Sequence, residues 1–261
     1  MNNKTKMNIG FKRVPAIDKC FAILELFARL KKPLGVSEIA KKLDYNKSTV
    51  FNMVHTLNDL GVLEKAGENK FQFGMQIYTL GKAAGRSSEL ISTVHPYLEK
   101  INQETKLSAF LGIRSGMRAV IIDKADTAFD IKLYSEIGMR IPLLAGAAGR
   151  VLLAQLSDAE VADILSKNKL EKFTPNSCVN KNKFKEMVKK ARRDGIAIDM
   201  EEYIEGIRGF GVPLNINRAN TQVAIWAVGL KRQITDETIP RYSEYLKKIA
   251  KDIEIRFTGG Y

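Results

Sequence analysis

The chain has 261 residues, 45% of them hydrophobic, and 42 Lys and Arg against 29 Asp and Glu give it a formal net charge of +13. This length favours two domains, and the basic excess indicates an anionic partner such as nucleic acid or membrane, unless it reflects only a lysine-rich composition. The two distant cysteines argue against a disulfide scaffold and fit a reducing cytoplasm. No apolar run approaches the ~20 residues of a membrane-spanning helix, and the first residues lack the apolar core of a signal peptide.

The positive charge is densest near the N-terminus. Residues 1–85 carry 14 Lys and Arg against 7 Asp and Glu, whereas residues 86–261 carry 28 against 22 over twice the length. We expect residues 1–12 to form a mobile basic tail. The dense charge therefore coincides with the stretch whose pattern is typical of DNA binding.

Three helices are predicted in that stretch, over residues 16–30, 36–43 and 47–60. In the first, apolar residues recur every three to four positions and predict a buried stripe of Ile17, Phe21, Leu24 and Phe27 or Ala28. Asn46 is a good N-cap for the third helix, and Gly61 suits the position just past its end. The core stripe of the third helix is expected at positions 50, 53, 54, 57 and 60.

Two short strands, residues 62–65 and 70–73, are predicted after the third helix. The sequence Ala-Gly-Glu-Asn between them fits a hairpin turn. Three helices followed by such a hairpin predict a winged helix-turn-helix domain over residues 13–74. The third helix would then enter a DNA groove.

A helical connector is predicted over residues 75–88, with a hinge at Gly85. The next helix spans residues 88–105 and either bends or begins at Pro96. From Leu107 onward, strands and helices alternate with one-sided packing, which predicts an α+β domain over residues 89–261. Expected strands are 108–114, 119–125, 130–136, 196–199, 209–215 and 222–230, and expected helices are 150–155, 158–166, 181–194 and 236–257.

Nearly the whole chain resembles the IclR family of bacterial transcription regulators. The N-terminal resemblance lies in the segments from Ala16, Ser37, Lys47, Thr56 and Phe71. The C-terminal resemblance lies in Gly138-Met-Arg-Ile-Pro-Leu, Ala148-Gly-Arg-Val-Leu-Leu-Ala, Arg192-Arg-Asp-Gly-Ile-Ala-Ile-Asp-Met-Glu-Glu and Gly206-Ile-Arg. The resemblance implies a GAF-like effector-binding and oligomerisation domain, an operator-binding homodimer or dimer of dimers, and a small organic effector.

The exposed face of the third helix holds the predicted DNA contacts. Asn52 stands where the family commonly has a basic residue, and asparagine can make a bidentate contact to adenine. Phe51 is expected either to contact a thymine methyl group or to pack in the core, and His55 either reaches a phosphate or is a solvated residue. Lys47 is expected to contact a phosphate. The full predicted set is Arg13, Lys47, Ser48, Thr49, Phe51, Asn52, His55, Lys65 and Lys70.

The resemblance also implies where the effector binds. Small residues before a helix allow a carboxylate to approach free backbone amides, although tight helix–sheet packing is the alternative explanation. The implied set is Leu133, Ile141, Ala147, Ala148, Asp199, Ile207, Gly209, Trp226 and Val228.

Three of these positions depart from the family pattern. Gly209 replaces a Cys or Ser, and Trp226 and Val228 stand where small hydroxyl residues are usual. The change predicts a pocket for an aromatic or apolar-tailed acid. The alternative is that Trp226 fills the cavity and abolishes the response.

No catalytic motif, metal-ligand spacing or cofactor motif is present in the sequence. The sequence thus predicts a non-enzymatic, cytoplasmic, ligand-responsive regulator, with no cofactor, metal or membrane partner, that controls a catabolic operon. The alternative is a ligand-binding protein or enzyme whose winged helix serves dimerisation or protein contact.

Overall fold

The computed structural model describes residues 14–86, 89–126, 135–216 and 221–258. The chain divides into two compact units between Ser87 and Ser88. None of the helices in these ranges is long and apolar enough to cross a membrane. The expected basic tail, Arg13 and Leu133 lie outside the described residues.

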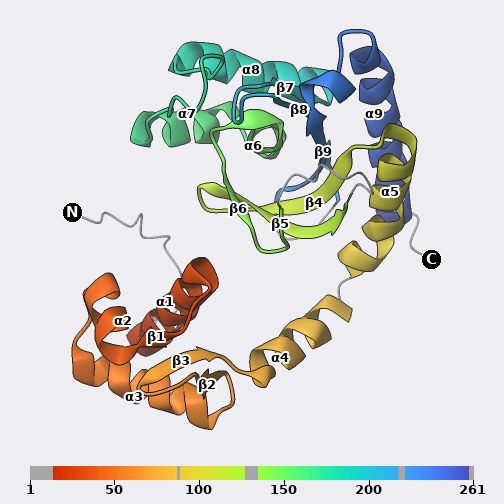
Figure 1. Cartoon of the computed structure of the whole chain (residues 1–261). Helices are drawn as coiled ribbons and strands as arrows, with labels where there is room; N and C mark the ends of the chain where they lie inside the picture. The colour runs from red at the N-terminus through yellow and green to blue at the C-terminus, as the bar shows by residue number, and fades with distance from the viewer. Residues whose placement is uncertain (1–13, 87–88, 127–134, 217–220, 259–261) are drawn as a thin grey trace. The chain divides into compact units, whose positions relative to one another are not determined.

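The described part of the first unit, residues 14–86, combines helices α1 to α4 with a small antiparallel sheet (Figure 1). Its sheet has the order β1-β3-β2, so the predicted hairpin is joined by a short strand that the sequence pattern had not indicated. In the hairpin turn, Gly67 and Asn69 adopt positive φ, and Ala66 N–H donates to the Lys70 carbonyl. The elements are α1 (Pro15–Leu30), β1 (Leu34–Gly35), α2 (Val36–Leu43), α3 (Lys47–Asp59), β2 (Leu63–Lys65), β3 (Lys70–Phe73) and α4 (Met75–Arg86).

The predicted stripe of α1 is confirmed only toward the end of the helix. Phe27 is buried and Leu24 packs against the core, whereas Ile17 and Phe21 are 56% and 62% exposed. Ile23 and Leu26, which were not predicted, complete the buried face because the apolar surface of α1 is wider than this small core can cover. The side chains of Ile17 and Phe21 therefore form an exposed apolar surface on α1.

Two details of α3 also differ from expectation. The helix ends at Asp59, and Leu60, expected in the core, is 63% exposed. Asn46 occupies the N-cap position without a side-chain capping hydrogen bond. Gly61 has the expected left-handed conformation, with φ of +70°, where glycine carries no steric penalty.

The second unit contains a six-stranded antiparallel sheet with the order β6-β5-β4-β9-β8-β7. This unit has the predicted α+β fold. Its elements are α5 (Glu89–Thr105), β4 (Ser108–Ser115), β5 (Arg118–Ala125), β6 (Arg140–Pro142), α6 (Gly146–Ala154), α7 (Asp158–Lys167), α8 (Lys181–Asp194), β7 (Ala197–Met200), β8 (Ile207–Leu214), β9 (Val223–Leu230), the 3₁₀ turn Lys231–Gln233 and α9 (Thr238–Thr258).

The sheet carries a separate apolar core on each face. Helices α5 and α9 pack on one face, and α6, α7 and α8 lie on the other (Figure 1). Phe210 belongs to the first core, whereas Phe110 and Trp226 belong to the second. This arrangement follows from the alternation of side chains along each strand.

The start of one helix in this unit was predicted wrongly, and one of the two alternatives at Pro96 is excluded. Helix α6 begins at Gly146 rather than Arg150, because the small residues form its first turn instead of a preceding loop. Helix α5 continues through Pro96 and does not begin there. The strand expected at 130–136 falls mostly outside the described residues, and Ser135 and Glu136 are not in a strand. Strand β6 was not predicted.

Glycines bring α6 close to its neighbours. A Cβ on Gly149 would collide with the carbonyl group of Leu143, and a Cβ on Gly211 would lie 3.0 Å from the Ala147 carbonyl oxygen. Backbone groups cannot move aside as easily as side chains can. Gly149 therefore lets α6 pack against the segment that precedes it, and Gly211 lets α6 pack on β8.

The substitution Gly149→Ala tests this close approach. Alanine in place of glycine normally stabilises a helix interior by about 1 kcal/mol, but here we expect a loss of about 1–3 kcal/mol from overpacking. Gly81→Ala in α4 is the matched control, because its added Cβ meets no atom within 4 Å. Denaturant unfolding that found both variants stabilised would contradict the close approach.

Candidate DNA interface and effector site

The exposed face of α3 gathers most of the predicted DNA contacts. Lys47, Ser48 and Asn52 are exposed, and Thr49 is half-buried. The opposite face holds the buried Val50, Val54 and Leu57, so hydrophobic packing fixes which side chains point outward. The first turn also presents backbone N–H groups that suit an anionic phosphate.

Phe51 and His55 interact with each other on this surface. Phe51 is 50% exposed, and its ring centroid lies 4.2 Å from that of the half-buried His55. His55 in turn contacts the ring of Phe71 in β3, edge to face at 5.4 Å. Phe51 is therefore not a core residue. His55 packs between the rings of Phe51 and Phe71 and is not a freely solvated side chain.

The hairpin adds positive charge beside this helix within the same unit. Lys65 ends β2 and Lys70 begins β3, and both are exposed at the base of the turn. The hairpin is braced by a hydrogen bond from Gln72 Nε2 to Glu64 Oε1 at 2.7 Å. Both lysines are accessible to an anionic partner.

In the second unit, the described residues of the predicted effector set lie on the sheet face that α6 covers, or in α6 itself. Asp199 pairs with Gly209, and Gly209 with Val228, across β7, β8 and β9. Strand alternation places Ile207 and Trp226 on the same face. Ile141, Trp226 and Val228 also pack in the core beneath α6, and Ala147 and Ala148 are buried in its first turn.

Asp199 lies against the start of α6. A Cβ added to Gly146, whose φ is +64°, would lie 2.7 Å from Asp199 Oδ2. Asp199 Oδ1 accepts a hydrogen bond from Glu202 N–H at 2.7 Å. Burial raises the pKa of Asp199 to about 6, opposed by that backbone hydrogen bond. The pKa of this carboxyl group therefore lies well above that of an exposed aspartate.

A buried ion pair fixes α6 to the loop after β7. Arg150 Nη1 lies 2.8 and 2.7 Å from the two carboxylate oxygens of Glu202, and Nη2 donates to the Ile198 carbonyl at 2.5 Å. The side chains are 3% and 13% exposed. Arg150 was not among the predicted site residues; it lies within the quoted segment Ala148–Ala154, but nothing in one sequence reveals that it is buried.

Trp226 occupies space beneath α6. It is 2% exposed and stacks on Phe110 with ring centroids 5.9 Å apart. A Cβ on Gly112 would collide with the indole ring, so glycine at that position accommodates the tryptophan. The indole thus occupies core space that a smaller side chain would leave open.

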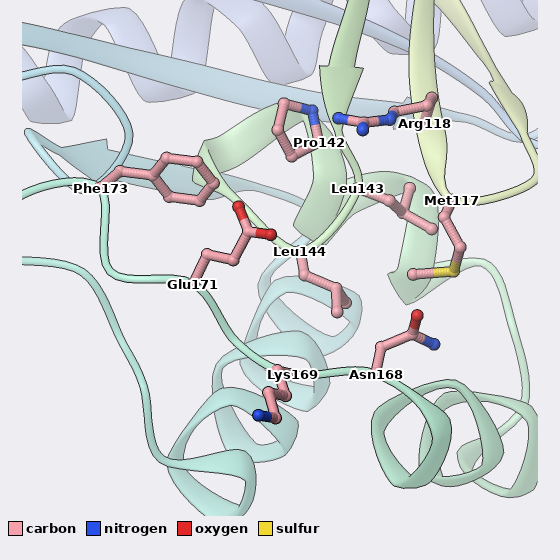
Figure 2. A pocket seen from close by; sticks show the side chains of 9 residues that line it. All are labelled: Met117, Arg118, Pro142, Leu143, Leu144, Asn168, Lys169, Glu171 and Phe173. Carbon is pink, nitrogen blue, oxygen red and sulfur yellow. The ribbon is translucent and has the colours of Figure 1, made fainter. Parts of the chain in front are cut away.

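A cavity of about 150 Å³ lies outside the predicted set (Figure 2). Its apolar wall comes from Pro142, Leu143 and Leu144, and the Arg118 guanidinium extends toward Pro142. Phe173, also on its wall, contacts Tyr203 edge to face at 5.1 Å. Sequence reasoning missed this cavity because three segments distant in sequence form it together: the β4–β5 turn, the segment before α6 and the loop after α7. The remaining lining residues are Met117, Asn168, Lys169 and Glu171.

A second cavity, of about 620 Å³, is strongly polar. Glu201, in its wall, lies 2.9 Å from Lys231 Nζ and 3.4 Å from Arg208 Nε. These contacts, with that to Lys231 foremost, lower the pKa of Glu201. Glu201 is thus paired with Lys231 and Arg208, whereas the neighbouring Glu202 is paired with Arg150. Across the described ranges, no group of three His, Cys, Asp or Glu side chains is arranged to hold a metal ion.

Comparisons with known proteins agree with both units. Residues 16–67 match the model of the IclR helix-turn-helix domain, and residues 82–255 match the model named bacterial transcriptional regulator IclR C-terminal. The transcriptional regulator XynR of Escherichia coli is 27% identical over 236 residues, covering 90% of this chain and 94% of its own length.

Solved structures show the same fold. An IclR transcriptional regulator from Alicyclobacillus acidocaldarius superposes with a TM-score of 0.84 at 22% identity, covering 93% of this chain and 98% of its own. An IclR homologue from Microbacterium hydrocarbonoxydans, complexed with 4-hydroxybenzoate, has a TM-score of 0.80 at 19% identity and covers 94% and 100%. Because the two family models together span most of the sequence, this chain belongs to the IclR family of bacterial transcriptional regulators.

Proposed function

We propose that this regulator binds operator DNA through α3 and the β2–β3 hairpin, and that a small organic acid alters that binding. The polar, outward face of α3 carries the proposal, because packing fixes it opposite the buried stripe. Lys47 contacts a phosphate, while Ser48 and Thr49 support the register of the helix on the DNA. Lys65, Lys70 and Arg13 add further backbone or minor-groove contacts.

Asn52 is the proposed reader of an adenine. Its side chain is exposed on α3, one turn from the helix start, where side chains of a recognition helix reach base edges. A side-chain amide can bond both N6 and N7 of adenine, whereas a basic residue would favour guanine. The operator is therefore expected to carry an A·T pair at this position.

The variant Asn52→Ala tests this assignment on an operator selected from random DNA. We expect the loss of about 1–3 kcal/mol to occur only on DNA with the preferred base pair, so that discrimination at one position disappears. Lys47→Ala is the control: it is expected to weaken all sequences alike and to reduce the salt dependence by about one phosphate contact. Equal weakening of every operator by Asn52→Ala would exclude base reading.

The proposed effector site lies at the start of α6, beside Asp199. Free backbone amides there attract a carboxylate, and a protonated Asp199 would donate a hydrogen bond to it instead of repelling it. The half-buried Val228, with the buried Trp226 beside it in the same core, makes the adjoining part of the sheet apolar. The 4-hydroxybenzoate complex of a structural relative supports an aromatic acid. We therefore propose an aromatic or apolar-tailed acid and a catabolic operon as the target.

A thermal-shift screen of small acids tests the effector class. Aromatic acids are expected to raise Tm in a concentration-dependent manner, because they bind only the folded protein. Small polar acids such as glyoxylate are the comparison. Stabilisation by the polar acids without any by aromatic acids would contradict the proposal, and no stabilisation by either would favour a cavity filled by Trp226.

Asp199 gives the protein a predictable pH dependence. Its folded-state pKa of about 6 lies above the ordinary aspartate pKa of 3.8, so its contribution favours folding below about pH 4 and is lost as pH rises through 6. Asn keeps the acceptor for Glu202 N–H but carries no charge. We expect Asp199→Asn to stabilise the protein by about 1–3 kcal/mol at pH 8 and by nearly nothing at pH 4. An equal effect at both pH values would contradict the burial of a titrating carboxyl.

We also propose that the protein acts in the cytoplasm as a homodimer or dimer of dimers, and not as an enzyme. Ile17 and Phe21 on α1, and Met75 and Tyr78 on α4, are exposed apolar side chains that self-association would bury. Two copies of α3 would then meet half-sites about one helical turn, or a multiple of it, apart. The regulator assignments of the relatives favour this over the alternative in which the winged helix only mediates protein contact.

A further inference from the structure

We infer that Phe51 reads the C5-methyl group of a thymine, and that His55 positions it for this contact. The inference rests on the proposed insertion of α3 into a DNA groove. Phe51, His55 and Phe71 are called the aromatic column below. They connect the exposed face of α3 to strand β3 of the hairpin.

The exposure of Phe51 needs an explanation beyond the fold. The core of the first unit is supplied on α3 by Val50, Val54 and Leu57, and Phe51 is not part of it. The residue is 50% exposed although its ring contacts His55. An aromatic ring held on an otherwise polar surface, between Ser48 and Asn52, is typical of a contact surface rather than a core.

The aromatic column fixes the direction of the Phe51 ring. His55 lies one turn further along α3, with ring centroids 4.2 Å apart and an interplanar angle of 41°. On its other side, His55 meets Phe71 at 5.4 Å and 77°. Phe71 is 3% exposed, and its backbone pairs with Leu34 in β1 and with Lys65 in β2. Through His55, the ring of Phe51 is thus connected to the buried Phe71, which lies in the middle strand of the sheet.

The chemistry of the major groove determines what such a ring can recognise. Thymine presents a methyl group there, whereas guanine, adenine and unmodified cytosine present polar atoms at their edges. An apolar ring placed against those polar atoms would displace water without replacing its hydrogen bonds. Phe51 therefore favours thymine, and 5-methylcytosine presents the same methyl group. With Asn52 next to it, the two residues would select neighbouring A·T pairs.

Replacement of single thymines by deoxyuridine is the direct test, because it removes the methyl group and leaves base pairing intact. The full-length protein and an operator selected from random DNA are used. Each half-site is expected to contain one critical thymine. Replacing that thymine in a single half-site should lower the affinity about fourfold, which is equivalent to the burial of one methyl-sized group. The same substitution is expected to have no effect on the Phe51→Ala variant.

Two further variants separate the roles within this surface. Asn52→Ala is the matched control and should keep the fourfold methyl effect. His55→Ala should retain DNA binding but reduce the methyl effect to less than twofold at the same thymine, because the Phe51 ring loses its support. An unchanged methyl effect in His55→Ala would overturn the positioning role.

The outcomes distinguish this inference from the function on which it rests. If the wild-type protein selects no specific DNA, the proposed operator binding by α3 fails. If it binds a specific operator and no single thymine shows a methyl effect that depends on Phe51, only the reading role of Phe51 fails. If 5-methylcytosine in place of the critical thymine, paired with guanine, restores part of the affinity lost with cytosine, the methyl group is the recognised feature.

Discussion

The buried ion pair between Arg150 and Glu202 is the contact on which the candidate effector site depends. Arg150 lies in α6 and also donates to the Ile198 carbonyl, so one guanidinium joins the helix to β7 and to the loop that follows it. Removing either partner would leave a charge buried without its counterion, a cost that far exceeds the value of an exposed pair. With α6 fixed in this way, its first turn remains beside Asp199.

Glycines and the indole of Trp226 complete the arrangement. Gly149 and Gly211 allow backbone to approach backbone, while Gly112 makes room for the indole. The second unit thus combines a tightly packed start of α6, the Asp199 carboxyl group with its raised pKa, and an apolar part of the sheet. These features support recognition of an acid whose tail is apolar, and they leave less space beneath α6 than small hydroxyl residues would.

Sequence reasoning succeeded where a local signal determines the structure. The order of helices and hairpin around Gly61 and the sheet-forming segments after Leu107 were predictable from periodicity and turn chemistry. It failed where tertiary packing decides: Ile17 and Phe21 had the expected spacing but are not covered by the core. The burial of Arg150, the contact of His55 with Phe71 and the cavity beside Arg118 depend on residues distant in sequence, so no single-sequence pattern reveals them.

The central claim is that DNA binding and acid binding are coupled in one molecule. Such coupling is reciprocal, because an effector that changes operator affinity by some factor must have its own affinity changed by the operator by the same factor. The most direct measurement is therefore titration of full-length protein with operator DNA in the presence and absence of a stabilising aromatic acid, together with the reverse titration. We expect equal factors of at least about fivefold in both directions. Tight binding of both ligands with no mutual effect would contradict it.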